Sequence, residues 1–370
     1  MKYKLIGELI NEVDLKNINN EELKVLGIKK DKTFFPTIAD LKDVDTSEYK
    51  IIQKNYFACN LIHVGRDAVL PIALHKESKR YLVSKAYKTF TVKENSEVTP
   101  EYLMIYFQNK EFDRYLWFIS DVGIRGELKW ERFLEIPIPI PNLNLQKEMS
   151  EMWINLKKNI EKIDRILTIK KHFISYYFSY IATNYKTKKL KEFIEIENFT
   201  NNEEIYQKSD VRGIAITKEF IKTKANLDNV NLKKYKIVNT NSFAYATNTS
   251  RMGDKLAIGL NKSTPILVST IYPVFKINSS KLMEDYLLAW FKREEFDRYA
   301  RFHSWGSARE IFSISDMENI DIPLPELSIQ KHVSSLNKNI EKLLTLKESY
   351  KKIISNLSPV LKVGIVSKKL

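Results

Sequence analysis

Apolar residues along this chain form the same pattern twice. Short β-branched and aromatic runs such as YKIIQKNYFAC and KTFTV predict strands in the first half, and PILVST and YPVFKI predict strands in the second half. Each half also contains one amphipathic segment, EYLMIYFQNKEFDRY at 101–115 and DYLLAWFKREEFDRY at 285–299, which predicts a single helix. This mixture of strands and helices indicates two α+β domains.

Both predicted helices end in the pentapeptide EFDRY, at Glu111–Tyr115 and Glu295–Tyr299. Helical spacing places its Phe and Tyr on the apolar face of the helix. The same spacing predicts that its aspartates, Asp113 and Asp297, and the adjacent arginines face solvent. We therefore interpret the motif as part of a packing helix that carries no chemistry.

Five sequence blocks recur in the same order at almost constant spacing. Tyr115 and Tyr299 are 184 residues apart, as are Ile138 and Ile322; Tyr81 and Ile266 are 185 apart, Lys4 and Lys189 are 185 apart, and Glu48 and Lys234 are 186 apart. The small changes in spacing fall between the blocks, where loops tolerate insertions. Because a period of this length is too long for a solenoid repeat, it predicts two copies of one domain.

An Ile-Pro run follows each predicted domain, and a long helix follows each run. The proline rings fix φ and keep the preceding residues out of the helical region, so the runs are predicted to be extended. The helices are predicted to begin near Asn144 and Ser328, which are favourable N-caps. KNIEK at 158–162 and 338–342 has an offset of only 180, which predicts four additional residues in the first helix if the two segments are equivalent.

Both long helices carry an apolar stripe with alternating steps of three and four residues. The predicted helix-pairing residues are Met149, Met152, Leu156, Ile160, Ile163 and Leu167 in the first helix, and Val333, Leu336, Ile340, Leu343, Tyr350 and Ile354 in the second. We favour pairing of the two helices with each other, and the alternative is that each helix lies on its own domain.

The predicted fold class is α+β, with two tandem domains and two long helices that form an antiparallel coiled coil with pseudo-two-fold symmetry. The predicted segments are residues 1–142 (domain 1), 143–186 (central helix), 187–326 (domain 2), 327–358 (C-terminal helix) and 359–370 (tail). An antiparallel arrangement would place the two domains at opposite ends of the coiled coil.

The charge of the chain narrows its possible partners. Sixty Lys and Arg against 46 Asp and Glu give a net charge of +14, which favours polyanions such as DNA and RNA or an anionic membrane surface. A single cysteine, Cys59, excludes an intramolecular disulfide and a thiolate zinc site. No stretch reaches the ~18 apolar residues of a membrane span, and the N-terminus lacks a secretory signal. We expect a cytoplasmic protein without a membrane partner.

Motifs that carry catalysis are missing from the sequence. It contains no GxxxxGK[ST] phosphate loop, no GxGxxG and no GxSxG elbow. The five histidines are scattered, and Cys59 lies in a strand-like run, so we interpret it as a buried structural residue. Glu22–Lys24 and Glu127–Lys129 match a short nuclease pattern that occurs often by chance in so charged a chain. We expect no catalytic, cofactor-binding or metal-binding residues.

Basic and amide side chains near predicted turns are the candidate DNA contacts, because Lys and Arg bind phosphates and Arg, Lys, Asn and Gln read base edges. The candidates are Arg66, Lys76, Lys79, Arg80 and Lys85 in the first half, Asn248, Thr249, Arg251, Lys255 and Lys262 in the second, and the aligned pair Arg125 and Arg309. Each of these residues has the alternative interpretation of a solvated loop residue or, for the last two, of a structural contact at the base of the long helix.

Taken together, these features resemble the specificity subunit of type I restriction–modification enzymes. The order carries the resemblance: a variable domain, an Ile-Pro run, Gln-Lys and a long helix, here IPIPIPNLNLQKEM, and then all of it again with IDIPLPELSIQKHV. The second copy is closer to the family pattern. The first departs from it at Trp130, where a Ser or Thr cap is expected.

The resemblance implies a DNA-recognition subunit without catalysis of its own. Each domain would read one half of a split site in double-stranded DNA, and the coiled coil would set the distance between the halves. Methyltransferase and restriction subunits would be its partners, and S-adenosylmethionine and ATP would belong to those partners. The alternatives are a catalytic protein such as a nuclease, a coiled-coil scaffold with incidental charge, and a DNA-binding protein outside restriction–modification.

Overall fold

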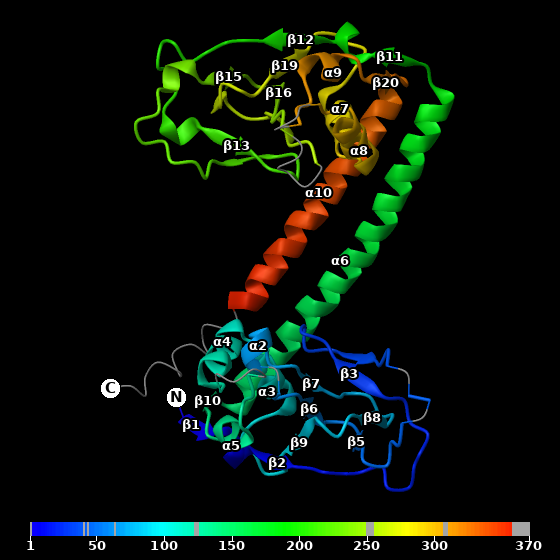
Figure 1. The fold of residues 1–370 in the computed structure, drawn as a ribbon, viewed down its shortest axis with the longest axis vertical. Coiled ribbons are helices and arrows are strands. Elements are labelled where there is room, and N and C mark those ends of the chain that lie inside the picture. The colour runs from blue at the N-terminus through cyan, green and yellow to red at the C-terminus, as the bar shows by residue number, and fades with distance from the viewer. Residues whose placement is uncertain are drawn as a thin grey trace. The chain divides into compact units, whose positions relative to one another are not determined.

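The computed structural model describes residues 2–39, 41–42, 44–62, 64–121, 126–248, 255–305 and 310–356. Its contacts group the chain into unit 1, residues 1–162 and 346–370, and unit 2, residues 163–345. Two long helices, α6 (Leu143–Asn184) and α10 (Leu327–Asn356), each contribute one part to each unit (Figure 1). The predicted domain limits and the two-fold relation between the domains stay predictions.

Unit 1 is built on a four-stranded antiparallel sheet in the order β2-β9-β6-β7, with three further two-stranded ladders, β3–β4, β5–β8 and β1–β10. Its strands are β1 (Lys2–Leu5), β2 (Ile10–Glu12), β3 (Leu26–Ile28), β4 (Phe34–Pro36), β5 (Lys50–Ile52), β6 (Phe57–Cys59), β7 (Ile72–Leu74), β8 (Tyr81–Val83), β9 (Lys88–Val92) and β10 (Pro137–Ile140). Its shorter helices are α1 (Ile6–Leu9), α2 (Val64–Asp67), α3 (Pro100–Phe107), α4 (Lys110–Ile119) and α5 (Trp130–Leu134).

Unit 2 repeats this topology with the sheet β12-β19-β16-β17 and the ladders β13–β14, β15–β18 and β11–β20. Its strands are β11 (Thr187–Lys189), β12 (Ile194–Glu197), β13 (Arg212–Ile214), β14 (Phe220–Lys222), β15 (Lys236–Val238), β16 (Ser242–Tyr245), β17 (Ile258–Leu260), β18 (Ile266–Val268), β19 (Val274–Ile277) and β20 (Asp321–Pro323). Its shorter helices are α7 (Glu284–Phe291), α8 (Glu294–Phe302), α9 (Ile314–Glu318) and the 3-10 turns η1 (Leu190–Glu192), η2 (Lys208–Asp210) and η3 (Leu232–Lys234). The predicted duplication of an α+β domain is confirmed.

The prediction of one helix over each EFDRY segment is wrong, because each segment folds as two helices. In unit 1, α3 ends at Phe107 and α4 begins at Lys110. Asn109 adopts extended backbone between them, and its side chain accepts a hydrogen bond from the backbone N–H of Glu111. A residue whose side chain caps a helix favours non-helical backbone at its own position. The chain therefore breaks into two helices at Asn109, although the spacing of apolar residues continues across the break.

Both Ile-Pro runs are extended, as predicted, and form the strands β10 and β20. Each pairs with the strand that opens its domain, β1 or β11, in a two-stranded ladder where proline is tolerated. The hydroxyl of Tyr102 on α3 donates to the carbonyl of Pro139 at 2.8 Å, and Tyr286 on α7 donates to Pro323 at 2.9 Å. The helix that follows the sheet is therefore fixed to the Ile-Pro strand in the same way in both domains.

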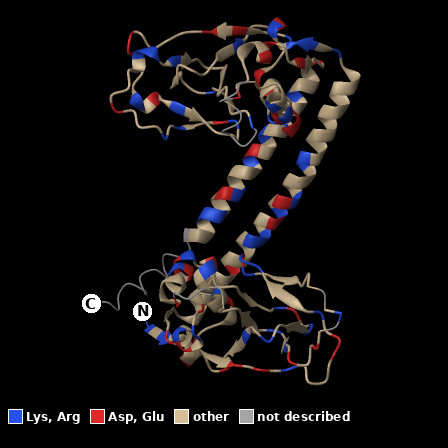
Figure 2. Ribbon diagram, viewed as in Figure 1, with Lys and Arg blue, Asp and Glu red and all other residues tan. Residues whose placement is uncertain are grey.

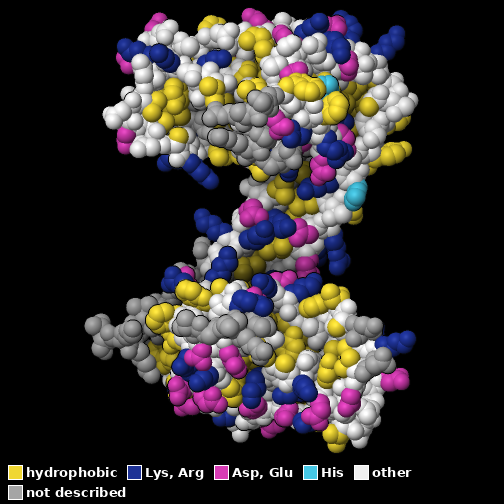
Figure 3. All heavy atoms as spheres, viewed as in Figure 1, with side chains coloured by type: hydrophobic (Ala, Val, Ile, Leu, Met, Phe, Trp, Pro, Cys, Tyr) yellow, Lys and Arg dark blue, Asp and Glu magenta, His cyan; other side chains and the backbone are white. Residues whose placement is uncertain are grey.

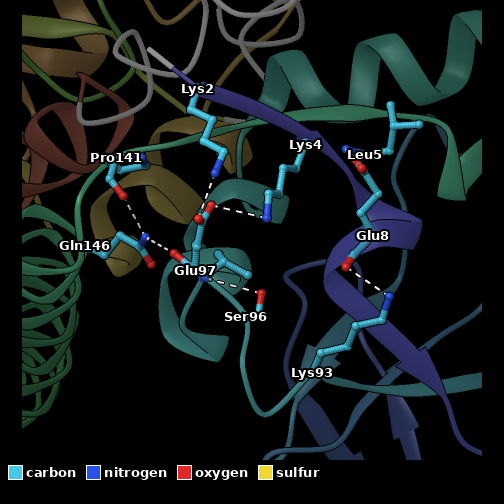
Figure 4. Close-up of polar contacts among 10 residues, drawn as sticks. Lys2, Lys4, Leu5, Glu8, Lys93, Ser96, Glu97, Pro141 and Gln146 are labelled. Carbon is cyan, nitrogen blue, oxygen red and sulfur yellow. Dashed lines mark hydrogen bonds and ion pairs between the residues drawn. The ribbon is translucent and has the colours of Figure 1, made fainter.

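Gln146, from the first Gln-Lys motif, is fully buried and joins the start of α6 to the domain (Figure 4). Its amide nitrogen donates to the carbonyls of Glu97 at 2.7 Å and Pro141 at 2.9 Å, and its amide oxygen accepts from the backbone N–H of Thr99 at 2.9 Å. The Glu97 side chain also pairs with Lys2 at 2.7 Å, and that contact holds the pKa of the Glu97 carboxyl below its ordinary value.

Gln330 makes the same three hydrogen bonds in unit 2. Its amide nitrogen donates to the carbonyls of Lys281 and Pro325, both at 2.9 Å, and its oxygen accepts from the N–H of Met283 at 2.9 Å. Each glutamine thus ties three segments together: the Ile-Pro run, the loop before α3 or α7, and the first turn of the long helix. The glutamine of the repeated Gln-Lys motif is therefore a buried anchor for the long helix.

The long helices begin slightly earlier than predicted. In α6 the cap is Asn142 rather than Asn144, since the Asn142 side chain accepts from the N–H of Leu145 at 2.9 Å. Further along, Lys157 donates to Gln108 at 3.0 Å, and the residues 184 positions later, Glu341 and Lys292, form an ion pair. The 184-residue equivalence therefore persists along the helix, and the four-residue insertion suggested by KNIEK is absent before Lys157.

Within unit 2, the second part of α6 runs antiparallel to the first part of α10. The backbone N–H of Leu324, just before α10, donates to the carbonyl of Lys186, just after α6, at 3.2 Å. The rings of Tyr177 and His332 meet edge to face with centroids 5.9 Å apart. Ile340 of α10 is also buried. Figure 1 shows the two helices side by side over this stretch.

The predicted pairing residues divide into several groups. Met149 and Val333 are buried in the cores of their own units, so the alternative of a helix lying on its domain holds near each helix start. Ile163, Leu167 and Ile340 are buried further along, and Leu156, Ile160, Leu336, Leu343, Tyr350 and Ile354 are half-buried. Met152 is 50% exposed, and its placement on the seam is wrong. It lies about 60° around the helix from Met149, whereas the other predicted residues of this helix all lie within about 40° of Met149.

We predict that Gln146→Ala and Gln330→Ala each lower the free energy of unfolding by about 2–4 kcal/mol, because three hydrogen bonds are lost and a backbone N–H is left without its acceptor. Urea unfolding measures the effect. Lys147→Ala, an exposed neighbour on the same helix, is the control and should change it by less than about 0.5 kcal/mol. Equal midpoints for the Gln146 and Lys147 variants would contradict the anchoring role.

Candidate nucleic-acid interface

The predicted DNA-contacting residues Arg66 and Arg251 belong to equivalent loops. The β6–β7 loop, residues 60–71, contains Arg66 and the short helix α2, and the β16–β17 loop, residues 246–257, contains Asn248 and Lys255. Cys59 pairs with Ile72 across the first hairpin, and Tyr245 pairs with Ile258 across the second. Thr249 and Arg251 lie outside the described residues.

A second predicted region lies against the β6–β7 loop. The backbone N–H of Gly65 donates to the carbonyl of Gly126 at 2.7 Å, and Leu128 donates to Leu61 at 2.9 Å. Gly126 has φ +58°, and a Cβ placed there would lie 2.7 Å from the backbone nitrogen of Arg66. These two backbone segments therefore cross at a point where only glycine fits.

The same crossing recurs in unit 2. Phe312 donates to the carbonyl of Thr247 at 2.8 Å, and Asn248 forms a bridge with Ile311. Arg125 and Arg309 precede these contact points in sequence and lie outside the described residues. The structure thus brings together the two regions that the sequence marked separately, the hairpin loop and the segment before α5 or α9.

Arg66 is exposed, and its guanidinium pairs with the neighbouring Asp67 at 3.1 Å. This contact holds the pKa of the Asp67 carboxyl below its ordinary value, and Lys30, 3.5 Å from Asp67, adds to the effect. Lys30 comes from the turn between β3 and β4 and was not among the predicted contacts. Because the Arg66 guanidinium is exposed to water, this ion pair is weak.

Lys76 and Lys262 lie at the other end of their hairpins. Lys76 follows β7 and Lys262 follows β17, whereas Arg66 and Lys255 precede these strands. Lys76 pairs with Glu101 at 3.8 Å, and Lys262 pairs with Asp285 at 3.3 Å. These equivalent ion pairs connect the hairpin to the start of α3 or α7, which is a structural role.

Lys79 and Arg80 accompany Lys76 rather than Arg66, because they follow β7. Arg80 pairs with Glu21, and the Lys79 carbonyl lies 2.7 Å from His75 Nε2. Lys85 is exposed in the turn between β8 and β9. The structure therefore separates Arg66, in the β6–β7 loop, from Lys76, Lys79 and Arg80, which follow β7, and it leaves the assignment of DNA contacts a prediction.

The solvent exposure predicted for the EFDRY aspartates is wrong. Asp113 and Asp297 are each only 8% exposed, while Arg114 and Arg298 do face solvent. Asp113 forms an ion pair with Lys32 at 2.7 Å, and Asp297 forms one with Lys218. Helical periodicity missed these contacts because both lysines come from distant hairpins. The recurrence of Lys32 and Lys218 at an offset of 186 was the available signal.

Burial determines the electrostatics of these pairs. Removal from water raises the pKa of the Asp113 carboxyl and lowers the pKa of the Lys32 and Lys218 ammonium groups, and the ion pair opposes these shifts. Cys59 is fully buried, and its burial strongly raises the pKa of the thiol, as a structural cysteine requires.

Charge is dispersed over the surface. Figure 2 shows Lys and Arg interspersed with Asp and Glu in both units, and the face seen in Figure 3 carries basic and acidic side chains next to one another. Among the residues that the structure describes, no cluster of His, Cys, Asp and Glu is arranged to hold a metal ion. None of the described helices is long and apolar enough to span a membrane.

No protein-family model matches the chain, and no curated protein matches it significantly. Among solved structures, it is similar to the type I restriction–modification system S subunit from M. genitalium, with 12% identity, coverage of 98% of this chain and 94% of that one, and a TM-score of 0.60. It also aligns with the HsdS subunit from Thermoanaerobacter tengcongensis at 11% identity, over 96% and 95% of the two chains, with a TM-score of 0.38. The chain therefore has the fold of the first S subunit, and the fold implied by the sequence resemblance is confirmed.

We predict that Gly126→Ala lowers the free energy of unfolding by about 2 kcal/mol or more, because alanine is strained at this φ and its methyl group would meet the Arg66 backbone. Gly213→Ala is the matched control, since a Cβ there meets no atom closer than 3.8 Å. Thermal unfolding of both variants checks the prediction, and a Gly126 variant as stable as the Gly213 variant would contradict the tight crossing.

Proposed function

We propose that this protein is the DNA-recognition subunit of a type I restriction–modification complex. Each unit presents one hairpin loop, β6–β7 or β16–β17, at an equivalent place on an equivalent sheet. The two loops have different sequences on the same scaffold. This single observation carries the proposal, because two similar domains with different loops suit the reading of two different half-sites. The fold shared with a type I S subunit supports it.

The net charge of +14 supports double-stranded DNA as the ligand. Phosphate contacts by Lys and Arg position a protein on the duplex, and base-edge contacts give specificity. Arg66 in the first loop, and Asn248, Thr249, Arg251 and Lys255 in the second, are the residues proposed to contact DNA. Arg125 and Arg309 are proposed to contact the backbone next to those loops.

The two long helices are proposed to set the spacing between the half-sites. With 42 residues, α6 is about 63 Å long, or roughly two turns of B-DNA. Methyltransferase subunits are proposed to dock on this chain, and restriction subunits to join the complex for cleavage. Catalysis, S-adenosylmethionine and ATP would then belong to those subunits. We place the complex in the cytoplasm.

The second candidate functions are a coiled-coil scaffold and a DNA-binding protein outside restriction–modification. The antiparallel packing of α6 and α10 in unit 2 is compatible with both. A scaffold has no need for two domains with different hairpin loops. A DNA-binding protein outside restriction–modification would bind its site without directing methylation.

Methylome sequencing of cells that express this chain with its neighbouring methyltransferase subunit tests the proposal. We expect one methylated sequence with two defined halves separated by unspecified bases. Replacement of residues 1–142 by the first domain of another such subunit should change one half only. Change of both halves, or methylation that does not depend on this chain, would contradict the proposal.

We predict that Arg66→Ala weakens DNA binding by the assembled complex about three- to tenfold, because one phosphate contact is lost. The slope of log K against log salt concentration should become smaller in magnitude by about one. Titration of a fluorescent duplex at several salt concentrations measures both quantities. Arg114→Ala removes another exposed arginine, on α4, and is the control. Arg66 would not contact DNA if both variants bound alike.

A further inference from the structure

The buried ion pair of unit 1 joins three segments of the domain. Lys32 Nζ contacts both carboxylate oxygens of Asp113, at 2.7 and 2.8 Å, and donates to the carbonyl of Phe107 at the end of α3. Asp113 Oδ1 also accepts the backbone N–H of Leu70 at 3.1 Å. Leu70 lies two residues before β7, where the β6–β7 loop rejoins the sheet. The carboxylate of α4 thus holds the returning end of the loop.

Unit 2 contains the same device. Lys218 pairs with Asp297, and Asp297 Oδ1 accepts the backbone N–H of Leu256 at 3.1 Å. Lys218 Nζ also donates to the carbonyl of Leu256 at 2.9 Å. Leu256 lies two residues before β17, at the returning end of the β16–β17 loop. Both the N–H and the carbonyl of Leu256 are therefore hydrogen-bonded to the ion pair.

Both lysines adopt a left-handed backbone conformation that is unfavourable for residues with a side chain. Lys32 has φ +65° and Lys218 has φ +66°, each at the last position of a tight hairpin turn. Glycine adopts this left-handed conformation without strain and is the usual residue in such turns. A lysine at this position is strained in both copies, so the long charged side chain has a role that glycine would not fulfil. That side chain is 4% exposed in each case, which excludes direct contact with DNA.

Stability alone does not explain the pairs. Replacement of a buried ion pair by apolar residues of similar size is often neutral or stabilising, because desolvation offsets the attraction between the charges. What apolar residues would not supply is an acceptor for the N–H of Leu70 or Leu256. The remaining function of the pair is to fix where the loop rejoins the sheet.

We propose that Lys32–Asp113 and Lys218–Asp297 are positioning pairs, each of which sets the geometry of the DNA-reading loop in its own domain. This inference rests on the proposed function. Each pair acts on one half-site only, because its contacts stay within its own unit. The EFDRY motif then has a defined role: its Phe packs in the core, its Glu and Arg pair at the surface, and its Asp controls the recognition loop.

The first test uses the complete chain assembled with its methyltransferase subunit. Asp113→Asn keeps the shape of the side chain but removes its charge, and we expect about a tenfold loss of discrimination among bases in the first half-site with the second half-site unchanged. Asp297→Asn is the mirror variant and should affect only the second half-site. Equal loss at both half-sites from either variant would overturn the proposal.

The second test separates positioning from stability. The double variant K32M/D113L replaces the charges by apolar side chains of similar size. We expect its Tm to fall by only a few degrees, because the apolar contacts offset the lost ion pair while the Leu70 N–H is left without an acceptor. Its discrimination at the first half-site should remain reduced, and the Leu70 amide should exchange with solvent about tenfold faster, because that N–H lacks its acceptor.

The outcomes distinguish this inference from the proposed function. Wild-type discrimination and slow Leu70 exchange in K32M/D113L would show that the pair contributes only stability, and would overturn the inference while leaving the proposed function intact. Absence of two-part methylation by the wild-type complex would contradict the proposed function. Hydrogen exchange of the Leu70 amide needs no DNA, so it would still show in that case whether the ion pair holds the end of the loop.

Discussion

The buried amide of Gln146, repeated at Gln330, is the interaction on which the architecture of each domain depends. A glutamine side chain offers one acceptor and two donors, and here all three are used on backbone groups of separate segments. Because the residue sits in the first turn of a long helix, its hydrogen bonds fix where that helix begins and how it leaves the domain. Any function of the helix as a spacer needs that fixed starting point.

The second fixed point in each domain is the carboxylate of Asp113 or Asp297. It lies on the helix that follows α3 or α7, and so it is connected through that helix to the same segments that the glutamine holds. One polar group thus anchors the long helix, and another anchors the returning end of the β6–β7 or β16–β17 loop. Between them lies a core of aromatic rings, including the stacked pairs Phe57–Phe90 and Phe243–Phe275 at centroid distances of 4.9 and 5.1 Å. A rigid core with two polar anchors lets the loop sequence vary without moving the helix.

The glycine crossing beside the β6–β7 loop follows the same logic. Gly65 and Gly126 bring two backbones closer than any side chain allows, and the exposed Arg66 sits next to the contact. Arg66, Asp67 and Lys30 form a small, water-exposed charge group above a rigid base. Because the Arg66 guanidinium is exposed to water, its pair with Asp67 is weak.

The sequence by itself determined the duplication, the extended Ile-Pro strands, the two long helices and the burial of Cys59 and Phe112, because these follow from spacing, proline geometry and local hydrophobic period. It did not determine the break in the helix at Asn109, the cap at Asn142, the exposure of Met152 or the burial of Asp113. The burial of Asp113 depends on which distant segment arrives at that position, whereas the break at Asn109 and the cap at Asn142 depend on which of several polar side chains caps the helix. The tertiary structure decided that Lys32 meets Asp113 and that Gly65 crosses Gly126, since no local pattern encodes partners 81 or about 60 residues away. Periodicity predicts which face of a helix is buried, and only the tertiary structure determines which charged side chain from a distant segment contacts that face.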